Sequence, residues 1–379
     1  MNGAPQPAAG LGQALRELYP ELETIAAAAS APAYVVGGAV RDALLGHGRG
    51  DLDLVTLGDA AELAASLSSH PVTAHDRFGT ATVALGGHRI DIARARTETY
   101  PRPGALPEVA PAADVESDLA RRDFTVNAIA VPVGGDRAID PHGGVADVAA
   151  RLLRVLHPRS FADDPTRAIR AARYAARLGF GLVPETERLL RAADLGTVSE
   201  DRRGAELARL AAEPSGPAGL RLLGEWGLLE LRPGGAELAE AVAELLGDEP
   251  WREEAPRAES VLVAALGPAG GEQELAAARP SRPSEGYELA SGRDPVELVL
   301  ARALGAEWLD AYLREWRSVA LEIDGAALLA AGVPEGPALG RALRAARRAA
   351  LDGEATGHEQ QLAIALAAAR ERWADGPIS

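Results

Sequence analysis

The pattern of apolar residues changes near residue 150, and this change limits the chain to a two-part architecture. Before residue 150, short β-branched runs alternate with helical segments. These runs predict five strands at Tyr34–Val36, Asp51–Thr56, Thr80–Leu85, Arg89–Ala93 and Asn127–Val131. Gly86-Gly87 predicts a hairpin turn between the third and fourth strands. After residue 150, helices rich in Ala, Leu, Arg and Glu follow one another, broken by Gly and Pro. We therefore expect an α+β fold, with a small mixed or antiparallel sheet followed by an all-helical remainder.

The composition excludes several classes of enzyme. The 379 residues include no cysteine and no lysine, so all 39 basic residues are arginine. Disulfides, thiolate catalysis, cysteine-ligated zinc, a Walker A loop and Schiff-base chemistry are therefore excluded. No uninterrupted apolar run reaches the ~18 residues that a membrane span requires. We expect a soluble, cytoplasmic protein.

The charge is unevenly distributed along the chain. The net charge of −16 argues against broad attraction to nucleic acid. Residues 151–210, however, carry 12 Arg against 8 Asp and Glu, a local charge of +4, which leaves −20 for the rest. A basic stripe on an acidic body is compatible with these numbers.

A glycine pair at the end of the first predicted strand is a candidate phosphate site. The segment Tyr34–Asp42 has the sequence YVVGGAVRD, in which a strand meets Gly37 and Gly38 and then a predicted helix. Glycines at a helix start leave the backbone N–H groups free to bind phosphate oxygens. Arg41, one helical turn later, can add a charge-assisted contact.

Three carboxylates on predicted strands are candidate metal ligands. Asp51 and Asp53 share one face of their strand because side chains alternate, and Asp91 is expected on a neighbouring strand. Carboxylates placed side by side are what Mg²⁺ requires, and three of them can hold two ions. Alone, a Gly-Gly pair is usually a turn and an Asp-x-Asp strand is usually an exposed sheet face. Their occurrence in this order within one α/β unit favours the functional interpretation.

Three stretches of the chain together resemble a known family. They are Val36–Gly46 with Asp51-Leu-Asp53, then Arg121–Ala130 (RRDFTVNAIA), then Asp163–Arg167 (DDPTR). Over about residues 30–210 this set resembles the class II CCA-adding enzyme and bacterial poly(A) polymerase family. The segment Leu321–Pro337 is more weakly similar to the helical tail of that family.

The resemblance implies a fold and a domain order. It implies a polymerase-β-like nucleotidyltransferase head at residues 1–150 and a nucleotide-reading helical neck at residues 151–210. It further implies a helical body at residues 211–285 and a tRNA-binding helical tail at residues 286–379. The basic run of the tail could hold the tRNA, although a solvated helix face is the simpler reading; it comprises Arg341, Arg344, Arg347 and Arg348.

The resemblance also implies roles for individual residues. Asp51 and Asp53 match the metal-binding pair, and Asp91 fits a third acidic position less securely. Gly37, Gly38 and Arg41 match the triphosphate-binding stretch. The positions that contact the sugar and phosphates of the incoming nucleotide match Arg122, Asp123 and Asn127. The cofactor implied is Mg²⁺.

In this family an Asp and an Arg of the neck pair with the base of CTP or ATP in place of a template. These positions fall on Asp164 and Arg167, and Asp163 stands where the family usually has a glutamate that orients the arginine. Arg170 and Arg173 follow at helical spacing and could meet triphosphate or tRNA phosphate. For Arg177, further along the same face, we favour a solvated position.

The expected activity is addition of CCA to the 3′ end of tRNA from CTP and ATP. The segment Thr97–Leu119 resembles the flexible loop needed to switch from CTP to ATP, which CC-only enzymes shorten. Its Pro-rich makeup suggests a mobile loop. Addition of A alone and poly(A) synthesis stay open, although Phe78–Thr82 and Asn127–Ala130 look more like CCA-adding than poly(A) enzymes.

Two further interpretations belong to different classes of protein. A non-catalytic tRNA- or nucleotide-binding protein would be expected to lose its acidic residues first, so intact Asp51 and Asp53 argue against it. A small-molecule nucleotidyltransferase would need neither Asp164 and Arg167 nor several helical domains. The sequence leaves the oligomeric state open.

Overall fold

The computed structural model describes residues 10–370 apart from 69–72, 76–78 and 269. The chain forms two compact units, Met1–Glu230 and Leu231–Ser379. Within the described ranges, no helix is both long and apolar enough to cross a membrane. The domain boundaries expected at residues 150, 210 and 285 stay predictions. Phe78, one of the residues used to favour CCA addition, lies outside the described residues.

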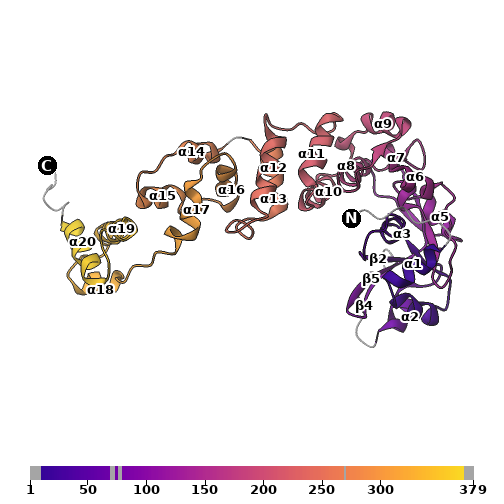
Figure 1. Ribbon diagram of the computed structural model, residues 1–379, viewed down its shortest axis with the longest axis horizontal. Helices are drawn as coiled ribbons and strands as arrows, with labels where there is room; N and C mark the ends of the chain where they lie inside the picture. Colours follow the sequence, from indigo (N-terminus) through magenta and orange to yellow (C-terminus); the bar gives the residue numbers. More distant parts are fainter. Residues whose placement is uncertain (1–9, 69–72, 76–78, 269, 371–379) are drawn as a thin grey trace. The chain divides into compact units, whose positions relative to one another are not determined.

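The first unit is built on a mixed sheet, drawn in indigo to purple in Figure 1. In the part of the chain that the structure describes, the sheet has six strands in the order β3-β4-β5-β2-β1-β8. Strand β2 runs parallel to β5, and the other neighbours are antiparallel. The strands are β1 Ala33–Val36, β2 Leu52–Thr56, β3 Thr73–His75, β4 Thr80–Leu85, β5 His88–Arg94 and β8 Ala130–Pro132.

Four of the five predicted strands are confirmed within one or two residues at each end, as β1, β2, β4 and β5. The turn at Gly86-Gly87 is also confirmed, because Leu85 pairs with His88 across the β4–β5 hairpin. The fifth prediction was partly wrong. Residues Thr125–Asn127 form a 3₁₀ turn, η2, and the strand starts only at Ala130.

Helices cover the sheet and supply its core. They are α1 Leu11–Leu18, α2 Glu21–Ala28, α3 Gly38–Leu44, α4 Ala60–Leu67, α5 Val115–Ala120 and α6 Gly144–Ala150. Apolar residues of β1 and β2 pack with Val115 and Leu119 of α5 in one buried cluster. Burying this apolar surface fixes α5 against the sheet. The residues that follow α5 are thereby held beside the ends of β1 and β2.

The segment Thr97–Leu119 contains regular structure on both sides of a loop at residues 100–107, and the mobility expected of it stays a prediction. Strands β6 Arg96–Thr99 and β7 Glu108–Pro111 form an antiparallel hairpin, and α5 follows it. The prolines that suggested a loop lie in the connection and at the end of β7. A two-stranded edge tolerates proline at such positions.

The remainder of the first unit is helical apart from a short pair of parallel strands, β9 Leu152–Leu153 and β10 Gly181–Leu182. Its helices are α7 Ser160–Asp163, α8 Thr166–Leu178, α9 Pro184–Arg191, α10 Glu200–Ala212 and α11 Gly216–Glu225, with a 3₁₀ turn η3 at Leu195–Thr197. Helix α8 packs against α10 and α11, and its residues Ala168, Ile169 and Ala172 are fully buried. Helical spacing places its arginines on the opposite side of α8 from these three residues.

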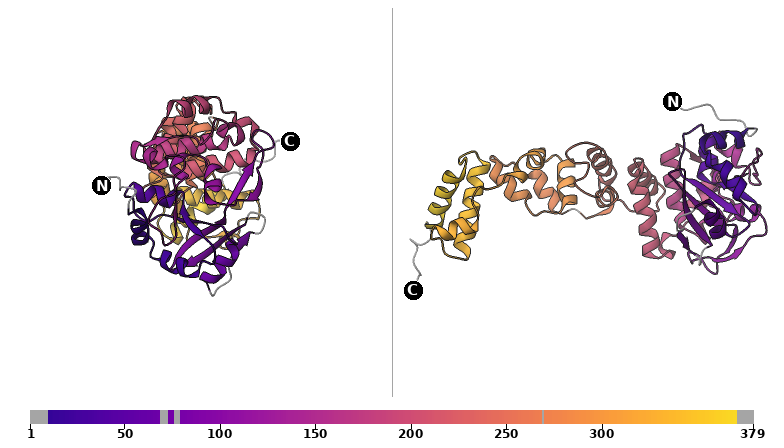
Figure 2. Two further views of the ribbon diagram at one scale, coloured as in Figure 1. Left: turned by 90° about the vertical axis from the view of Figure 1, so that its right-hand side faces the viewer. Right: turned by 90° about the horizontal axis from the view of Figure 1, so that it is seen from below.

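All regular secondary structure described in the second unit is helical. Its elements are α12 Gly235–Leu245, α13 Arg257–Leu266, α14 Gly271–Ala277, α15 Pro283–Ala290, α16 Pro295–Ala303, α17 Trp308–Arg314, η4 Trp316–Ser318, α18 Gly325–Ala330, α19 Pro337–Leu351 and α20 His358–Arg370. Figure 2 shows α19 and α20 in yellow, and these two helices pack on each other around Leu328, Ala342 and Ala365. The expectation of an α+β fold with a helical remainder is confirmed.

Candidate active site

One cavity of the first unit, with a volume of about 670 Å³, collects most of the predicted site residues. Among the described residues, ten arginines and seven carboxylates line it, a formal balance of +3. This local excess on a chain of net charge −16 suits a phosphate-bearing substrate. The predicted residues in the lining are Gly37, Gly38, Arg41, Asp51, Asp53, Arg122, Asp123, Asn127, Asp164, Arg167, Arg170 and Arg173.

Asp51 and Asp53 form an acidic edge of the cavity. Asp51 directly precedes β2 and Asp53 is its second residue, so alternation places both on the exposed face while Leu52 and Leu54 are buried. No described side chain or backbone group donates a hydrogen bond to either carboxylate. Asp53 is open to the cavity on one side and enclosed by protein on the others. This enclosure raises its pKa; Arg122 opposes the shift, and Asp91 and Asp51 add to it.

Asp91 lies on β5 directly opposite Asp53, and the two carboxylates together line a second cavity; Asp91 does not line the first. Its carboxylate accepts hydrogen bonds from Thr82 Oγ1 at 2.5 Å and Arg89 Nη2 at 3.0 Å. Among the described residues, no three His, Asp or Glu side chains converge closely enough to hold a metal ion. Asp53 therefore adjoins both Asp51, with which it shares the first cavity, and Asp91, with which it shares the second. A metal-binding role for Asp91 stays a prediction.

The glycine turn leads into α3. Gly37 has φ = +68°, a left-handed conformation that favours glycine, and a Cβ there would lie 3.2 Å from Arg122 Nη1. Arg41, one turn into the helix, is buried. Its Nη1 donates to Asn127 Oδ1 at 2.6 Å, and its Nη2 pairs with Asp42 at 2.8 Å.

A buried polar network joins the sheet domain to helix α8. Asp123 accepts from Asn127 Nδ2 at 3.0 Å and from Arg170 Nε at 2.8 Å. Burial alone would raise the pKa of Asp123, but Arg170 and Asn127 outweigh it and lower that pKa to about 2. Arg122 donates to Asp118 Oδ2 at 3.0 Å and to the Asn127 carbonyl at 3.3 Å. The 3₁₀ turn at Asn127 thus serves this network rather than the sheet.

Asp164 and Arg167 lie at the start of α8 on a second edge of the cavity. Arg167 is buried and donates to Ser160 Oγ at 2.8 Å and to the Arg121 carbonyl at 2.7 Å. Asp163, expected to orient Arg167, instead accepts from Arg159 Nη2 at 2.9 Å. No hydrogen bond joins Asp163 and Arg167, both of which the structure describes, and Asp163 does not line the cavity. Ser160 makes the contact with Arg167.

Tyr174, which sequence reasoning missed, lies among the arginines of α8. The guanidinium carbons of Arg170 and Arg173 lie 5.6 and 5.2 Å from the centre of its ring. Those of Arg41 and Arg177 lie 5.5 and 5.6 Å away. Such cation–π contacts hold guanidinium groups without cancelling their charge. Arg177 is exposed, as predicted, and it also lines the cavity, 3.4 Å from Glu213.

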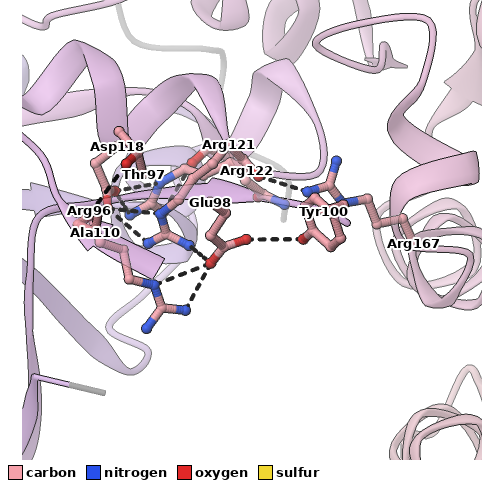
Figure 3. Close-up of polar contacts among 10 residues, drawn as sticks. Arg96, Thr97, Glu98, Tyr100, Ala110, Asp118, Arg121, Arg122 and Arg167 are labelled. Atoms are coloured by element: carbon pink, nitrogen blue, oxygen red, sulfur yellow. Dashed lines mark hydrogen bonds and ion pairs between the residues drawn. The ribbon is translucent and has the colours of Figure 1, made fainter. Parts of the chain in front are cut away.

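The hairpin β6–β7 supplies a second missed group, shown in Figure 3. Glu98 Oε1 accepts from Arg96 at 2.9 Å and from Arg121 at 2.8 Å, and its Oε2 accepts from the Tyr100 hydroxyl at 3.0 Å. The guanidinium of Arg167 lies 6.0 Å from the centre of the Tyr100 ring. Arg96, Glu98 and Tyr100 are two residues apart, so strand alternation was a signal that could have grouped them.

The arginines expected to contact tRNA in the second unit differ in how they are held. Arg347 Nη1 donates to the Tyr287 hydroxyl at 3.0 Å, and Arg348 pairs with Glu288. Arg344 is exposed and makes no hydrogen bond or ion pair with the described residues. Arg344 is therefore the member of this run most available to a phosphate.

A pair of carboxylates beside an arginine-lined cavity, on a mixed sheet with an adjoining helical region, defines a nucleotidyltransferase. The comparisons with known proteins agree. Residues 33–154 match the family described as the poly A polymerase head domain. The chain is 38% identical to the CC-adding tRNA nucleotidyltransferase of Deinococcus radiodurans over 325 residues, which cover 82% of each chain. It belongs to the family of CCA-adding enzymes and related tRNA nucleotidyltransferases.

Other relatives match in part or in structure. The chain is 49% identical to the A-adding tRNA nucleotidyltransferase of Aquifex aeolicus over 179 residues, 45% of this chain but only 22% of that protein. The chain thus spans about a fifth of the length of that relative. The Thermotoga maritima CCA-adding enzyme complexed with tRNA matches 94% of this chain and 98% of its own, with a TM-score of 0.73 and 27% identity.

Proposed function

We propose that the chain adds C, C and A to the 3′ end of tRNA from CTP and ATP, with Mg²⁺ and without a nucleic-acid template. One observation carries this proposal. The acidic edge, Asp51 and Asp53, and the pair Asp164 and Arg167 line the same cavity. Chemistry and choice of nucleotide can therefore take place at one site.

The acidic edge suits a divalent cation. Asp51 and Asp53 receive no hydrogen bond from the described residues, and enclosure together with neighbouring carboxylates raises the pKa of Asp53. Such a site is short of positive charge, and oxygen ligands are those that Mg²⁺ prefers. When bound, Mg²⁺ would lower the pKa of a 3′-hydroxyl and neutralise charge on the triphosphate.

The remaining chemistry falls to the arginines and the glycine turn. The 3′-hydroxyl oxygen of tRNA attacks the α-phosphorus, and a new P–O bond forms as the P–O bond to the β-phosphate breaks. Pyrophosphate leaves, and the hydroxyl proton passes to solvent. Arg122 and Arg170 lie at the cavity wall, each held by a carboxylate, where a triphosphate would meet their guanidinium groups. Preorganised charge of this kind stabilises the transition state without reorganisation during the reaction.

Asp164 and Arg167 have the hydrogen-bonding character needed to select C and A. Cytosine and adenine each present an exocyclic amino group that a carboxylate can accept from, whereas uracil and guanine present an oxygen there. A guanidinium only donates, so Arg167 suits the ring nitrogens and carbonyls of the accepted bases. A mismatched base leaves a buried polar group unpaired, which is the basis of strong rejection.

Addition of CC alone is the second candidate. It is favoured by the Deinococcus relative, which matches most of this chain. The hairpin formed by Arg96–Thr99 and Glu108–Pro111, with Tyr100 in the cavity, favours full CCA addition, because the expected distinction is a shortened segment in CC-only enzymes. Addition of A alone and poly(A) synthesis remain outcomes of the test below. The intact Asp51 and Asp53 argue against a non-catalytic binding protein.

The proposal also covers tRNA binding outside the cavity. We propose that the tail, residues 286–379, holds the body of the tRNA through phosphate contacts that do not read sequence. From these substrates we infer a cytoplasmic location for the activity.

Sequencing the 3′ ends of tRNA products tests the proposal. A tRNA lacking CCA should gain two C residues with CTP alone and a terminal A when ATP is added, after which addition should stop. Products ending at CC with both nucleotides present would establish CC-only addition. Addition of A only to tRNA ending in CC would establish the A-adding alternative, and long A tracts would indicate poly(A) synthesis.

A further inference from the structure

The carboxylate of Asp164 is held on one of its two oxygens. Oδ1 accepts from the Thr166 hydroxyl at 2.7 Å, from the Thr166 backbone N–H at 3.2 Å and from Arg202 Nη2 at 3.0 Å. Among the described residues, no donor reaches Oδ2. A carboxylate oxygen has about two lone-pair sites, so Oδ1 is saturated and Oδ2 is left for another partner.

Arg202 comes from a different part of the fold. It lies in the first turn of α10, 38 residues along the chain from Asp164, and it lines the same cavity. Its second amino group, Nη1, donates to the carbonyl of Gly104 at 3.0 Å, in the connection between β6 and β7. One guanidinium group therefore joins the base-reading carboxylate to the tip of the hairpin.

The hairpin tip is closely fitted at this point. Gly104 has φ = +69°, and a Cβ there would overlap the backbone carbonyl of Thr197. The Gly104 N–H also lies 3.3 Å from the carbonyls of Ala162 and Asp163, which directly precede Asp164. The acceptor that Arg202 uses at Gly104 is thus fixed relative to Asp164.

We propose that Arg202 is a positioning residue for nucleotide selection. Arg202 donates to Oδ1 of Asp164 and to the Gly104 carbonyl, and in this way it keeps Oδ2 directed at the amino group of cytosine or adenine. This inference rests on the proposed function. Without Arg202 the carboxylate can turn about its χ2 bond and accept from other donors, which weakens the distinction between an amino group and an oxygen on the base.

The role depends on the shape of arginine as well as its charge. A guanidinium presents several N–H donors in a planar fork, so it can serve Asp164 and Gly104 together. A lysine ammonium is a single point charge on a flexible chain and cannot keep the same two directions. We therefore expect Arg202→Lys to restore charge without restoring selectivity.

The test is single-nucleotide addition to tRNA lacking CCA, with CTP against UTP, and to tRNA ending in CC, with ATP against GTP. In Arg202→Met and Arg202→Lys, the ratio of kcat/KM for correct over incorrect nucleotide should fall roughly tenfold or more. Thr166→Val, which removes one of the three donors to Oδ1, should lower the ratio less. Arg203→Met is the matched control, because Arg203 is the adjacent arginine of α10 and does not line the cavity.

The outcomes separate positioning from a general loss of structure. A selective rise in kcat/KM for UTP and GTP, with kcat for CTP within a few-fold of the parent and a cooperative unfolding transition that shows the variant is folded, supports the inference. Equal losses for correct and incorrect nucleotides in both variants would overturn it. So would an unchanged ratio in Arg202→Met when the parent chain adds CCA. A parent chain that adds no nucleotide to tRNA would overturn the proposed function, and this inference with it.

Discussion

The two edges of the cavity are held in opposite ways. At the acidic edge, Asp51 and Asp53 accept no hydrogen bond from the described residues, and the pKa of Asp53 is raised. At the second edge, which we propose reads the base and call the base-reading edge, Asp164 accepts three hydrogen bonds on one oxygen, and Arg167 donates to Ser160 and to the Arg121 carbonyl. The carboxylates of the acidic edge receive no hydrogen bond from the described residues, whereas Asp164 and Arg167 are each held by several.

The difference follows from what each edge would do. A carboxylate that binds a cation gains its partner from solution, so protein donors placed on it would compete with the metal. A group that reads a base must keep its direction before the base arrives, because selectivity comes from fixed donors and acceptors. We therefore expect substitutions at the two edges to affect activity, selectivity and stability differently.

The largest effect is expected at the acidic edge. Asp51→Ala or Asp53→Ala should lower kcat for nucleotide addition at least about 1000-fold, because metal ligands act on the reacting phosphate directly. Stability should not fall, since neither carboxylate contributes a hydrogen bond to the fold. Rates of addition and thermal unfolding of both variants give the measurement. Near-normal turnover in either variant would show that the substituted aspartate is not a metal ligand.

Substitution at the base-reading edge should affect both selectivity and stability. Arg167→Ala should blur the choice between CTP and UTP, and it should also cost roughly 1–3 kcal/mol of folding free energy by leaving Ser160 and the Arg121 carbonyl unpaired. Misincorporation assays and denaturant unfolding measure the two effects. Ser160→Ala removes only one partner of Arg167, so it should change both misincorporation and folding stability less. Strict exclusion of UTP by Arg167→Ala would contradict the base-reading role.

The buried network between the edges predicts a pH dependence of stability. The folded pKa of Asp123 is lowered to about 2, below its unfolded value, so its contribution is present above pH ~4 and is lost as pH falls through 2. The shift corresponds to about 2 kcal/mol at neutral pH. Urea unfolding of the parent and of Asp123→Asn at several pH values measures it. We expect a flatter pH dependence in Asp123→Asn, and parallel curves would contradict the assignment.

The smallest effect is expected in the second unit. Arg344→Ala should weaken tRNA binding a few-fold and reduce the salt dependence of binding by about one phosphate contact, with kcat unchanged. Arg348→Ala is the matched control, because Arg348 is already paired with Glu288. Binding titrations at several salt concentrations distinguish them. An equal change in the two variants would show that the unpaired Arg344 contributes no more to tRNA binding than the paired Arg348.

The parts of the site that the sequence predicted are local in the chain. Strand alternation placed Asp51 and Asp53 on one face, and the glycine turn before α3 followed from two adjacent glycines. Each of these features needs only the period of one element and the residues next to it. The prediction that these residues share a site with Asp164 and Arg167 came only from the resemblance to a family.

The contacts that were not predicted join distant segments, although the segment Glu200–Glu206 was expected to have a structural role that supports the site. Arg202 meets Asp164 only because α10 packs on α8, and Tyr100 reaches the cavity only because β6 and β7 pair. The prolines of that segment suggested a loop, since local propensity cannot show that an edge hairpin accommodates them. Asn127 was placed on a strand, whereas its buried bonds to Arg41 and Asp123 require a 3₁₀ turn.

The claim that catalysis and base reading belong to different edges of the cavity is tested most directly by measuring nucleotide binding in the absence of turnover. Calorimetric titration of CTP and UTP into Asp53→Ala and into Asp164→Ala compares selectivity where chemistry cannot contribute. We expect Asp53→Ala to keep the preference of the parent for CTP over UTP, even if both bind more weakly, and Asp164→Ala to lose most of it. Loss of the preference in Asp53→Ala, or its retention in Asp164→Ala, would contradict the assignment of catalysis and base reading to separate edges of the cavity.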